Sequence, residues 1–200
     1  MFEALLGSEA VTLAKPDYYE DFYRVLEGDI DRFDKLERGQ SFREPGFDSW
    51  EAFQRGDWSA ALALIEKCRA SFAEYYQGMT NRGFTCRRVR VVELPVTPYI
   101  QWEMHVLRLR AELGEDIRVV PADLLGELEE QRNVPELVVL GRRALYEVVY
   151  DEEGVSAGAR RYADPALIER AIEEIGALYS QGEDLFEFFD REISALAPPV

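Results

Sequence analysis

The chain has 200 residues, and its 39 acidic and 23 basic side chains give a formal net charge of −16 at pH 7. Because a surface that binds nucleic acid must neutralise phosphates with Lys and Arg, this balance argues against direct binding of DNA or RNA. The apolar fraction of 47% is typical of a globular protein, and no apolar run approaches the length of a membrane span. The N-terminus also lacks a basic segment followed by an apolar one, so we expect a cytosolic protein without membrane contact.

The first part of the chain, residues 1–56, is expected to be a helical extension. Pro16 begins a predicted helix that is rich in aromatic residues. Ile30, Phe33 and Leu36 then follow at a spacing that predicts a second helical segment. The density of aromatic side chains indicates that this extension packs on a sheet domain formed by residues 57–200.

A long helix is predicted to open that sheet domain, and one strand–helix–strand unit to follow it. Asp57 caps the helix, whose apolar stripe runs from Trp58 to Tyr76. The unit spans residues 84–121. It consists of a strand over Cys86–Glu93, a helix that begins at Pro98 and is ended by Gly114, and a second strand over Ile117–Val120. A helix between two such strands predicts that they pair in parallel.

The C-terminal part is expected to add antiparallel pairing. Residues 121–133 are expected to be helical or irregular. Three strands are predicted next, Glu136–Leu140, Ala144–Tyr150 and Val155–Tyr162. A helix that Asp164 caps and Gly182 ends then follows, and after it a short aromatic turn. Gly154 closes the hairpin between the last two strands. The expected fold class is therefore mixed α/β, with a sheet of about five strands, a βαβ crossover, a C-terminal hairpin and covering helices.

Glu103 is the first candidate for a functional residue, because it lies on the edge of the apolar stripe of the crossover helix. Arg88 and Arg90 share one face of the preceding strand, so either one is within reach of this carboxylate. One interpretation is a buried ion pair that fixes helix on sheet. The other is a polar cleft at the strand ends, lined by Arg88, Arg90, Glu103 and Arg118.

Two aromatic residues of the crossover helix, Tyr99 and Trp102, are further ligand-binding candidates. Their spacing favours a place in the core over a stacking platform, and the acidic balance weakens the platform further. The Gly114–Glu115–Asp116 turn is expected to expose its two acids. We do not assign a catalytic residue beyond the candidate Glu103.

Metal, cofactor and nucleophile motifs are missing from the sequence. His105 is the single histidine, and it is expected to be a solvated or partly packed helix residue. Cys68 and Cys86 are expected to be small core residues. With no phosphate-binding glycine motif and no nucleophile elbow, we expect neither a cofactor nor a metal.

Several segments in combination resemble the actinobacterial domain of unknown function 6879 family (DUF6879) over roughly residues 42–190. They are RRVRVVELPVTPYIQWE (87–103), GEDIRVV (114–120) and the hairpin loop DEEG (151–154). The resemblance implies a regulatory or toxin–antitoxin-like setting beside helix-turn-helix regulators, but no activity. The strand–helix–strand order is also similar to half of a phospholipase D-like domain, although the H-x-K motif of that chemistry is missing, since Val106 and Leu107 follow His105.

Two hypotheses of function follow. The first is a non-catalytic cytosolic binding or regulatory module that contacts a protein partner such as a DNA-binding regulator, or a small ligand, with its acidic surface facing a basic partner. The second is an unfamiliar enzyme in which Glu103 is the general acid/base and Arg88 and Arg90 hold an anionic substrate.

Overall fold

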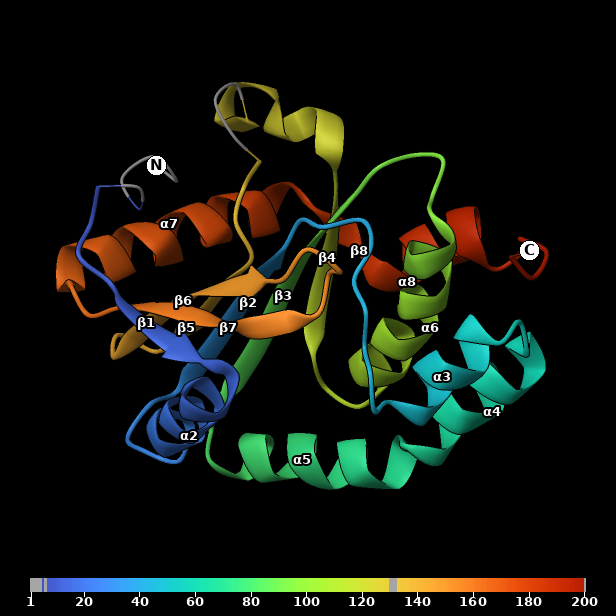
Figure 1. Ribbon diagram of the computed structural model, residues 1–200, viewed down its shortest axis with the longest axis horizontal. Coiled ribbons are helices and arrows are strands. Elements are labelled where there is room, and N and C mark those ends of the chain that lie inside the picture. The colour runs from blue at the N-terminus through green and yellow to red at the C-terminus, as the bar shows by residue number, and fades with distance from the viewer. Residues whose placement is uncertain (1–4, 6, 130–132, 200) are drawn as a thin grey trace.

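The computed structural model describes residue 5 and residues 7–129 and 133–199. Within these residues one sheet of eight strands runs through the molecule in the order β1-β7-β6-β5-β2-β3-β4-β8 (Figure 1). The strands are β1 (Val11–Ala14), β2 (Arg32–Glu37), β3 (Thr85–Val92), β4 (Asp116–Pro121), β5 (Leu137–Leu140), β6 (Ala144–Tyr150), β7 (Ser156–Tyr162) and β8 (Glu183–Asp184). The mixed α/β class is confirmed, but the expected number of about five strands was too low.

The middle of the sheet is parallel and its flanks are antiparallel. β2 pairs with β3 and β3 with β4 in parallel, whereas β5, β6, β7 and β1 form antiparallel ladders on one side and β8 pairs antiparallel on the other. The parallel crossover and the C-terminal hairpin are therefore confirmed. Both parallel connections step in the same direction along the sheet, so a common hand places their helices on one face.

Two helical layers cover the sheet (Figure 1). α7 (Pro165–Gln181) packs on one face, where its apolar stripe meets Leu36, Val89 and Val91. The opposite face carries α2 (Lys15–Leu26), α5 (Arg69–Asn81) and α6 (Pro98–Glu112), with α3 (Asp48–Gln54), α4 (Trp58–Lys67) and α8 (Leu185–Phe188) packed around α6. Short turns of 3-10 helix (Ala122–Glu129) and π-helix (Phe189–Ile193) complete the described chain.

The N-terminal region differs most from the expectation. β1 and β2 both come from residues 1–56, and β2 lies between β3 and β5 in the centre of the sheet. The helix predicted around Ile30, Phe33 and Leu36 is therefore wrong. The sheet draws its strands from both sides of the boundary that was expected between residues 56 and 57, whereas the aromatic helix that contains Pro16 is confirmed as α2.

The long helix predicted from Asp57 to Tyr76 is divided in two at Cys68. Asp57 caps α4 as expected, its side chain accepting a hydrogen bond from the Ala60 N–H. At Cys68 the chain leaves α4 and enters α5, and the Ser71 hydroxyl donates to the Cys68 carbonyl at 2.9 Å. α5 can then run under the sheet while α4 stays beside α6 (Figure 1). The predicted excursion over 121–133 is a 3-10 helix up to Glu129, and its residues 130–132 lie outside the described part of the chain.

Candidate functional site

Charged side chains occupy the sheet face that lies under α5 and α6. The register pairs Lys35 with Arg88 and Glu37 with Arg90, so strand alternation directs all four toward these helices. Glu103 of α6 and Glu115, which follows α6, complete the set. We call these six residues the charged layer: Lys35, Glu37, Arg88, Arg90, Glu103 and Glu115.

One end of the charged layer is the predicted pair of strand and helix. Arg90 Nε donates to Glu103 Oε2 at 2.7 Å, and Tyr99 donates its hydroxyl to Glu103 Oε1 at 3.2 Å. The remaining Arg90 donors go to the backbone carbonyls of Gly39, Val91 and Glu37 at 2.6, 2.9 and 3.3 Å. Burial raises the pKa of the Glu103 carboxyl, and Arg90 offsets only part of that rise. The structure therefore contains the buried ion pair of the first interpretation of Glu103.

The other end of the charged layer centres on Arg88, which bridges two carboxylates. Its Nε donates to Glu115 Oε1 at 2.7 Å, and its Nη1 donates to Glu37 Oε2. Burial alone would raise the pKa of Glu37 and of Glu115, but the adjacent Arg88 brings both below their usual range. The Tyr76 hydroxyl donates to the second oxygen of Glu115, so the acid that was expected to be exposed in the turn is buried instead.

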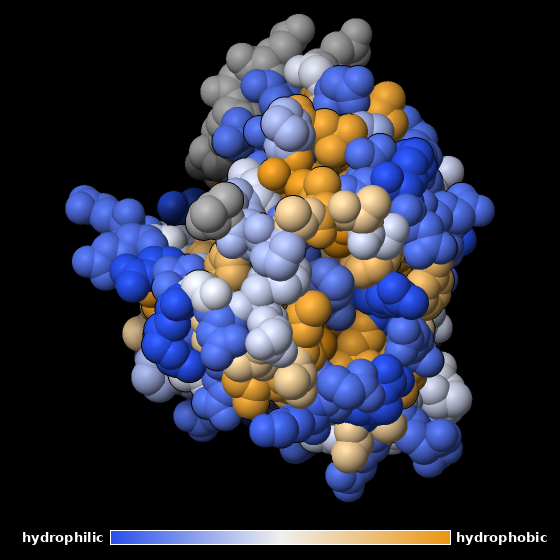
Figure 2. All heavy atoms as spheres, turned by 90° about the vertical axis from the view of Figure 1, so that its right-hand side faces the viewer, coloured by the Kyte–Doolittle hydropathy of each residue, from blue (hydrophilic) through white to orange (hydrophobic). Residues whose placement is uncertain are grey.

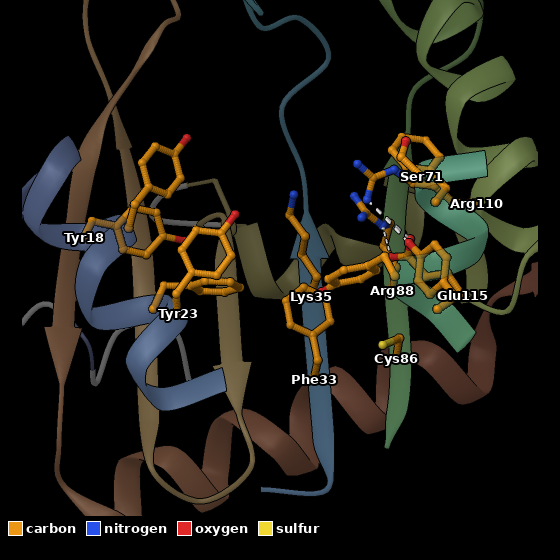
Figure 3. A pocket seen from close by; sticks show the side chains of 14 residues that line it. Tyr18, Tyr23, Phe33, Lys35, Ser71, Cys86, Arg88, Arg110 and Glu115 are labelled. Carbon is orange, nitrogen blue, oxygen red and sulfur yellow. Dashed lines mark hydrogen bonds and ion pairs between the residues drawn. The ribbon is translucent and has the colours of Figure 1, made fainter. Parts of the chain in front are cut away.

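A cavity of about 520 Å³ opens over Arg88, between α2 and α5 (Figure 3). Its floor is the surface of β2 and β3, with Phe33 and Lys35 on one strand and Cys86 and Arg88 on the other. Tyrosines of the two helices form most of its walls. We call this space the tyrosine-walled cavity; the tyrosines that line it are Tyr18, Tyr19, Tyr23, Tyr75 and Tyr76.

Three of these tyrosines are unusually open to solvent for their size. Tyr19, Tyr23 and Tyr75 keep 43%, 54% and 40% of their surface exposed, around the mouth of the cavity. Deeper inside, burial raises the pKa of the Cys86 thiol to about 12, so this cysteine is a protonated part of the floor at neutral pH. An apolar, aromatic wall with a few polar groups at its base is the usual make-up of a ligand site.

A second cavity, of about 170 Å³, lies on the other side of Arg88 and reaches Glu103. Tyr99 and Trp102 line it, and only 4% and 2% of their surfaces are exposed, which agrees with the expected place in the core. Lys35 and Arg88 line both cavities. The charged layer therefore lies between the two cavities and contributes side chains to the lining of both.

Arg118 lies apart from the other predicted site residues. In the parallel ladder it is level with Val89, and thus on the sheet face that α7 covers. Its guanidinium stacks 5.6 Å from the ring centre of Tyr179 in that helix. The predicted cleft with Arg88, Arg90 and Arg118 in one wall is therefore not formed, because a one-residue difference in register reverses the direction of the side chain.

Comparison with known proteins identifies the family. The model described as Domain of unknown function (DUF6879) matches residues 20–190. The chain belongs to the DUF6879 family. No curated protein and no solved structure matched this DUF6879 chain. The family match begins before residue 42, where the sequence resemblance started, and so it includes β2 and most of α2.

Metal binding and membrane spanning find no support in the described part of the DUF6879 chain. It contains no group of three or more His, Cys, Asp or Glu side chains placed to hold a metal ion. None of its described helices combines the length and apolar character needed to cross a membrane. His105 is partly packed, as expected, with its ring 5.4 Å from Trp58 and 4.9 Å from Phe189.

Several site residues of the DUF6879 chain were missed at the sequence level. Lys35 and Glu37 lie on the strand that was predicted as helix, and Glu115 was assigned to a solvent-facing turn. The tyrosines had a visible signal: Tyr18, Tyr19 and Tyr23 spread around more of α2 than one buried face can cover. The exposed remainder lines the cavity.

Proposed function

We propose that this chain is a non-catalytic cytosolic binding module that recognises its target at the tyrosine-walled cavity. One observation carries the proposal: exposed tyrosines surround the mouth of a cavity of about 520 Å³. Ligand sites in proteins typically measure about 300–1,000 Å³. Tyrosine is also among the residues that contribute most to binding energy at protein interfaces.

The state of the charged layer favours binding over catalysis. Glu103 has one oxygen against Arg90 and the other against Tyr99. A general acid or base must reach the proton that it transfers, and this carboxylate is held on both sides by scaffold groups. Glu37 and Glu115 are likewise paired with Arg88. The contacts of Glu103 and Glu115 are suited to fixing α6 on the sheet, and that of Glu37 joins β2 to β3.

The partner that we propose is a protein, such as a DNA-binding regulator, and not nucleic acid itself. A net charge of −16 would repel phosphates but complements a basic partner. Elsewhere on the molecule, the face seen in Figure 2 shows hydrophobic spots interrupted by hydrophilic side chains. The rim of the cavity, with Tyr19 and Tyr23 from α2 and Tyr75 from α5, is the better centre for an interface.

Affinity capture with matched variants tests this proposal. The bait is the full chain, compared with Tyr19→Ala/Tyr23→Ala and with a control, Leu124→Ala/Leu128→Ala, which truncates exposed residues of the 3-10 helix. We expect the wild type and the control to retain the same basic, DNA-binding protein, and the tyrosine variant to lose it. Equal capture by all three baits, or retention of nothing from the native lysate, would contradict the proposal; circular dichroism checks that each bait is folded.

An enzyme remains the second candidate, and the cavity of about 170 Å³ beside Glu103 is the observation in its favour. In this alternative Glu103 is the general acid/base and Arg88 and Arg90 hold an anion. Its test is incubation of a small-molecule cell extract with the wild type and with Glu103→Gln, followed by mass spectrometry. A compound consumed by the wild type alone supports the enzyme, and identical extracts count against it.

The similarity to half of a phospholipase D-like domain stays a prediction from sequence. The binding module proposed above does not depend on it. His105 packs between Trp58 and Phe189, away from both cavities that touch Arg88. It lines instead a separate cavity of about 230 Å³, together with Arg69 and Arg108.

A further inference from the structure

We propose that the tyrosine-walled cavity takes a small, planar aromatic molecule that carries one negatively charged group. This inference rests on the function proposed above and extends it: the protein partner would contact the rim of the cavity, and the small molecule would occupy its interior. The negative group would meet the basic side chains on the floor, and the ring would lie among the tyrosines of the walls. Three features of the cavity lead to this ligand: its charge balance, its hydrogen-bond donors and the chemistry of its walls.

The charge balance of the lining is opposite in sign to that of the whole chain. Among the described residues that line the cavity, Lys35, Arg88 and Arg110 are basic and Glu115 is acidic. Glu37, which follows Lys35 on the same sheet face of β2, accounts for one further negative charge through its contacts with Lys35 and Arg88. Glu44 lies close enough to act on Lys35 and Tyr19, so acids next to the cavity offset part of its positive charge. The lining itself has three bases against one acid in a protein of net charge −16, so an anion inside the cavity would meet the bases directly.

Hydrogen-bond donors are also in surplus at the floor. Lys35 Nζ has three N–H donors, and the residues that the structure describes give it one close partner, Glu37 Oε1 at 2.5 Å. Arg110 reaches Glu115 Oε2 and the Tyr76 hydroxyl only at 3.7 and 3.5 Å. Figure 3 shows Lys35 between the tyrosines of α2 and the group formed by Arg88, Arg110 and Glu115. A carboxylate or similar anion at this place would accept the donors that remain.

The aromatic side chains of the cavity walls favour a ligand that contains an aromatic ring. Tyr18 and Phe22 of α2 lie on one side, and Phe72 and Tyr75 of α5 on the other, with Phe33 on the floor between them. Aromatic rings attract one another in offset or edge-to-face contacts when their centres are 4.5–7 Å apart. A cation held by the same rings would have to approach three basic side chains, which is why we favour an anion over an aromatic cage for an ammonium group.

Three naphthalene probes of equal size test the inference by isothermal titration calorimetry with the full chain. They are 2-naphthoate (negative), 2-naphthamide (neutral) and 2-naphthylmethylammonium (positive), with acetate as an anion without a ring. We expect naphthoate to bind about tenfold more tightly than naphthamide, because charge-assisted hydrogen bonds are the stronger ones. We expect no measurable binding of acetate or of the ammonium probe.

Variants then locate the binding. Lys35→Met should weaken naphthoate about tenfold and leave naphthamide unchanged, whereas Lys35→Arg should retain naphthoate binding. Lys67→Met, an exposed lysine at the end of α4, is the matched control and should bind like the wild type. Tyr23→Ala should weaken naphthoate and naphthamide alike, since it removes ring contacts and no charge.

Among the probes, the inference would be overturned by equal affinity for naphthoate and naphthamide, by tighter binding of the ammonium probe, or by no naphthoate binding at millimolar concentration. Among the variants, it would be overturned if Lys35→Met left naphthoate binding unchanged. Equal affinities that both fall in Tyr23→Ala would refute the anion and leave the cavity as the binding site. The capture experiment with the Tyr19 and Tyr23 variants fails separately if the proposed function is wrong, so the two failures are distinguishable.

Discussion

Arg90 and Glu103 face each other across the interface of β3 and α6, with 2.7 Å between Nε and Oε2 and none of the arginine side chain exposed to solvent. A charge so deeply buried is tolerated only when it is paired and its other polar atoms are satisfied. Three backbone carbonyls, those of Glu37, Gly39 and Val91, accept the other Arg90 hydrogen bonds. The pair thus joins the crossover helix, its own strand and the end of the neighbouring strand.

Removing one partner of this pair should destabilise the fold strongly. We expect Arg90→Leu to lower the free energy of unfolding by about 3–5 kcal/mol, because it leaves the Glu103 carboxylate buried without a counter-charge. The double variant Arg90→Leu/Glu103→Leu should recover part of the loss. Urea denaturation followed by fluorescence measures each value.

A surface pair supplies the control for this experiment. Arg142 Nε lies 2.6 Å from Glu169 Oε2, and both side chains are largely exposed. Arg142→Leu should cost less than about 1 kcal/mol. If Arg90→Leu were no more costly than Arg142→Leu, the locking role of the buried pair would be wrong.

His105 should make stability depend on pH. Burial lowers the pKa of its imidazole to about 4, with Arg108 adding to the effect, against about 6.5 in an unfolded chain. Between these values the unfolded chain binds more protons, so stability is complete above about pH 6.5 and falls as the pH drops toward 4. We expect His105→Phe, which keeps a ring in place, to lose about 2 kcal/mol less than the wild type between pH 7 and pH 4.5.

Nuclear magnetic resonance can follow the same group directly, since His105 is the single histidine of the sequence. Its ring signals should stay constant from pH 8 to about pH 5 and then titrate with a midpoint near pH 4. A midpoint close to the ordinary value of about 6.5 would show that the ring is not desolvated in solution.

Two glycines with opposite expectations test the packing of β1. Gly158 has φ +145°, and an added Cβ would lie 2.1 Å from the Leu13 carbonyl oxygen of β1. Gly158→Ala should therefore lower the unfolding free energy by about 2 kcal/mol or more, because either β1 or the backbone must move. Gly176→Ala, inside α7 with no atom within 4 Å of the new methyl group, should raise it by about 0.5–1 kcal/mol. Thermal unfolding of both variants decides, and equal midpoints would contradict the close approach of the two strands.

Cys86 should react slowly with thiol reagents although it lines a cavity. Its raised pKa of about 12 leaves very little thiolate at pH 8, and the greater nucleophilicity of a high-pKa thiolate offsets only part of that loss. Disulfide exchange should therefore be roughly fiftyfold slower than in the unfolded chain. The Cys68→Ser variant leaves Cys86 as the single thiol and makes the rate readable by absorbance with a chromogenic disulfide. A rate within tenfold of that in urea would refute the desolvated environment.

The sequence pattern predicted those strands in which apolar and polar residues separate cleanly. β3 through β7 were found because turns or helices of readable chemistry bound them, such as Gly154 with its φ of +81°. β2 was missed because Lys35 and Glu37 are charged yet point inward, and its apolar Phe33 and Leu36 are three residues apart, as on a helix. A buried charged face removes the very signal by which strands are recognised.

The candidate site was predictable only where a single unit of the chain contains it. Arg90 and Glu103 belong to one βαβ unit, so strand alternation and helix packing together placed them near each other. Glu37 reaches Arg88 from a strand that was predicted as a helix, and Glu115 reaches it from the turn after α6. Both contacts depend on the order of the strands in the sheet. The cavity between α2 and α5 depends on the same long-range order, which local patterns do not contain.

The central position of β2 has a consequence for how this chain can be shortened. A fragment beginning at residue 57 would leave β3 and β5 with facing edges of unpaired backbone donors and acceptors, separated by the width of a missing strand. Such a fragment either closes the gap with a wrong register or recruits another molecule to fill it. Residues 1–56 are thus required for a continuous sheet. A synthetic peptide that spans them would supply the missing strand β2 to a truncated chain.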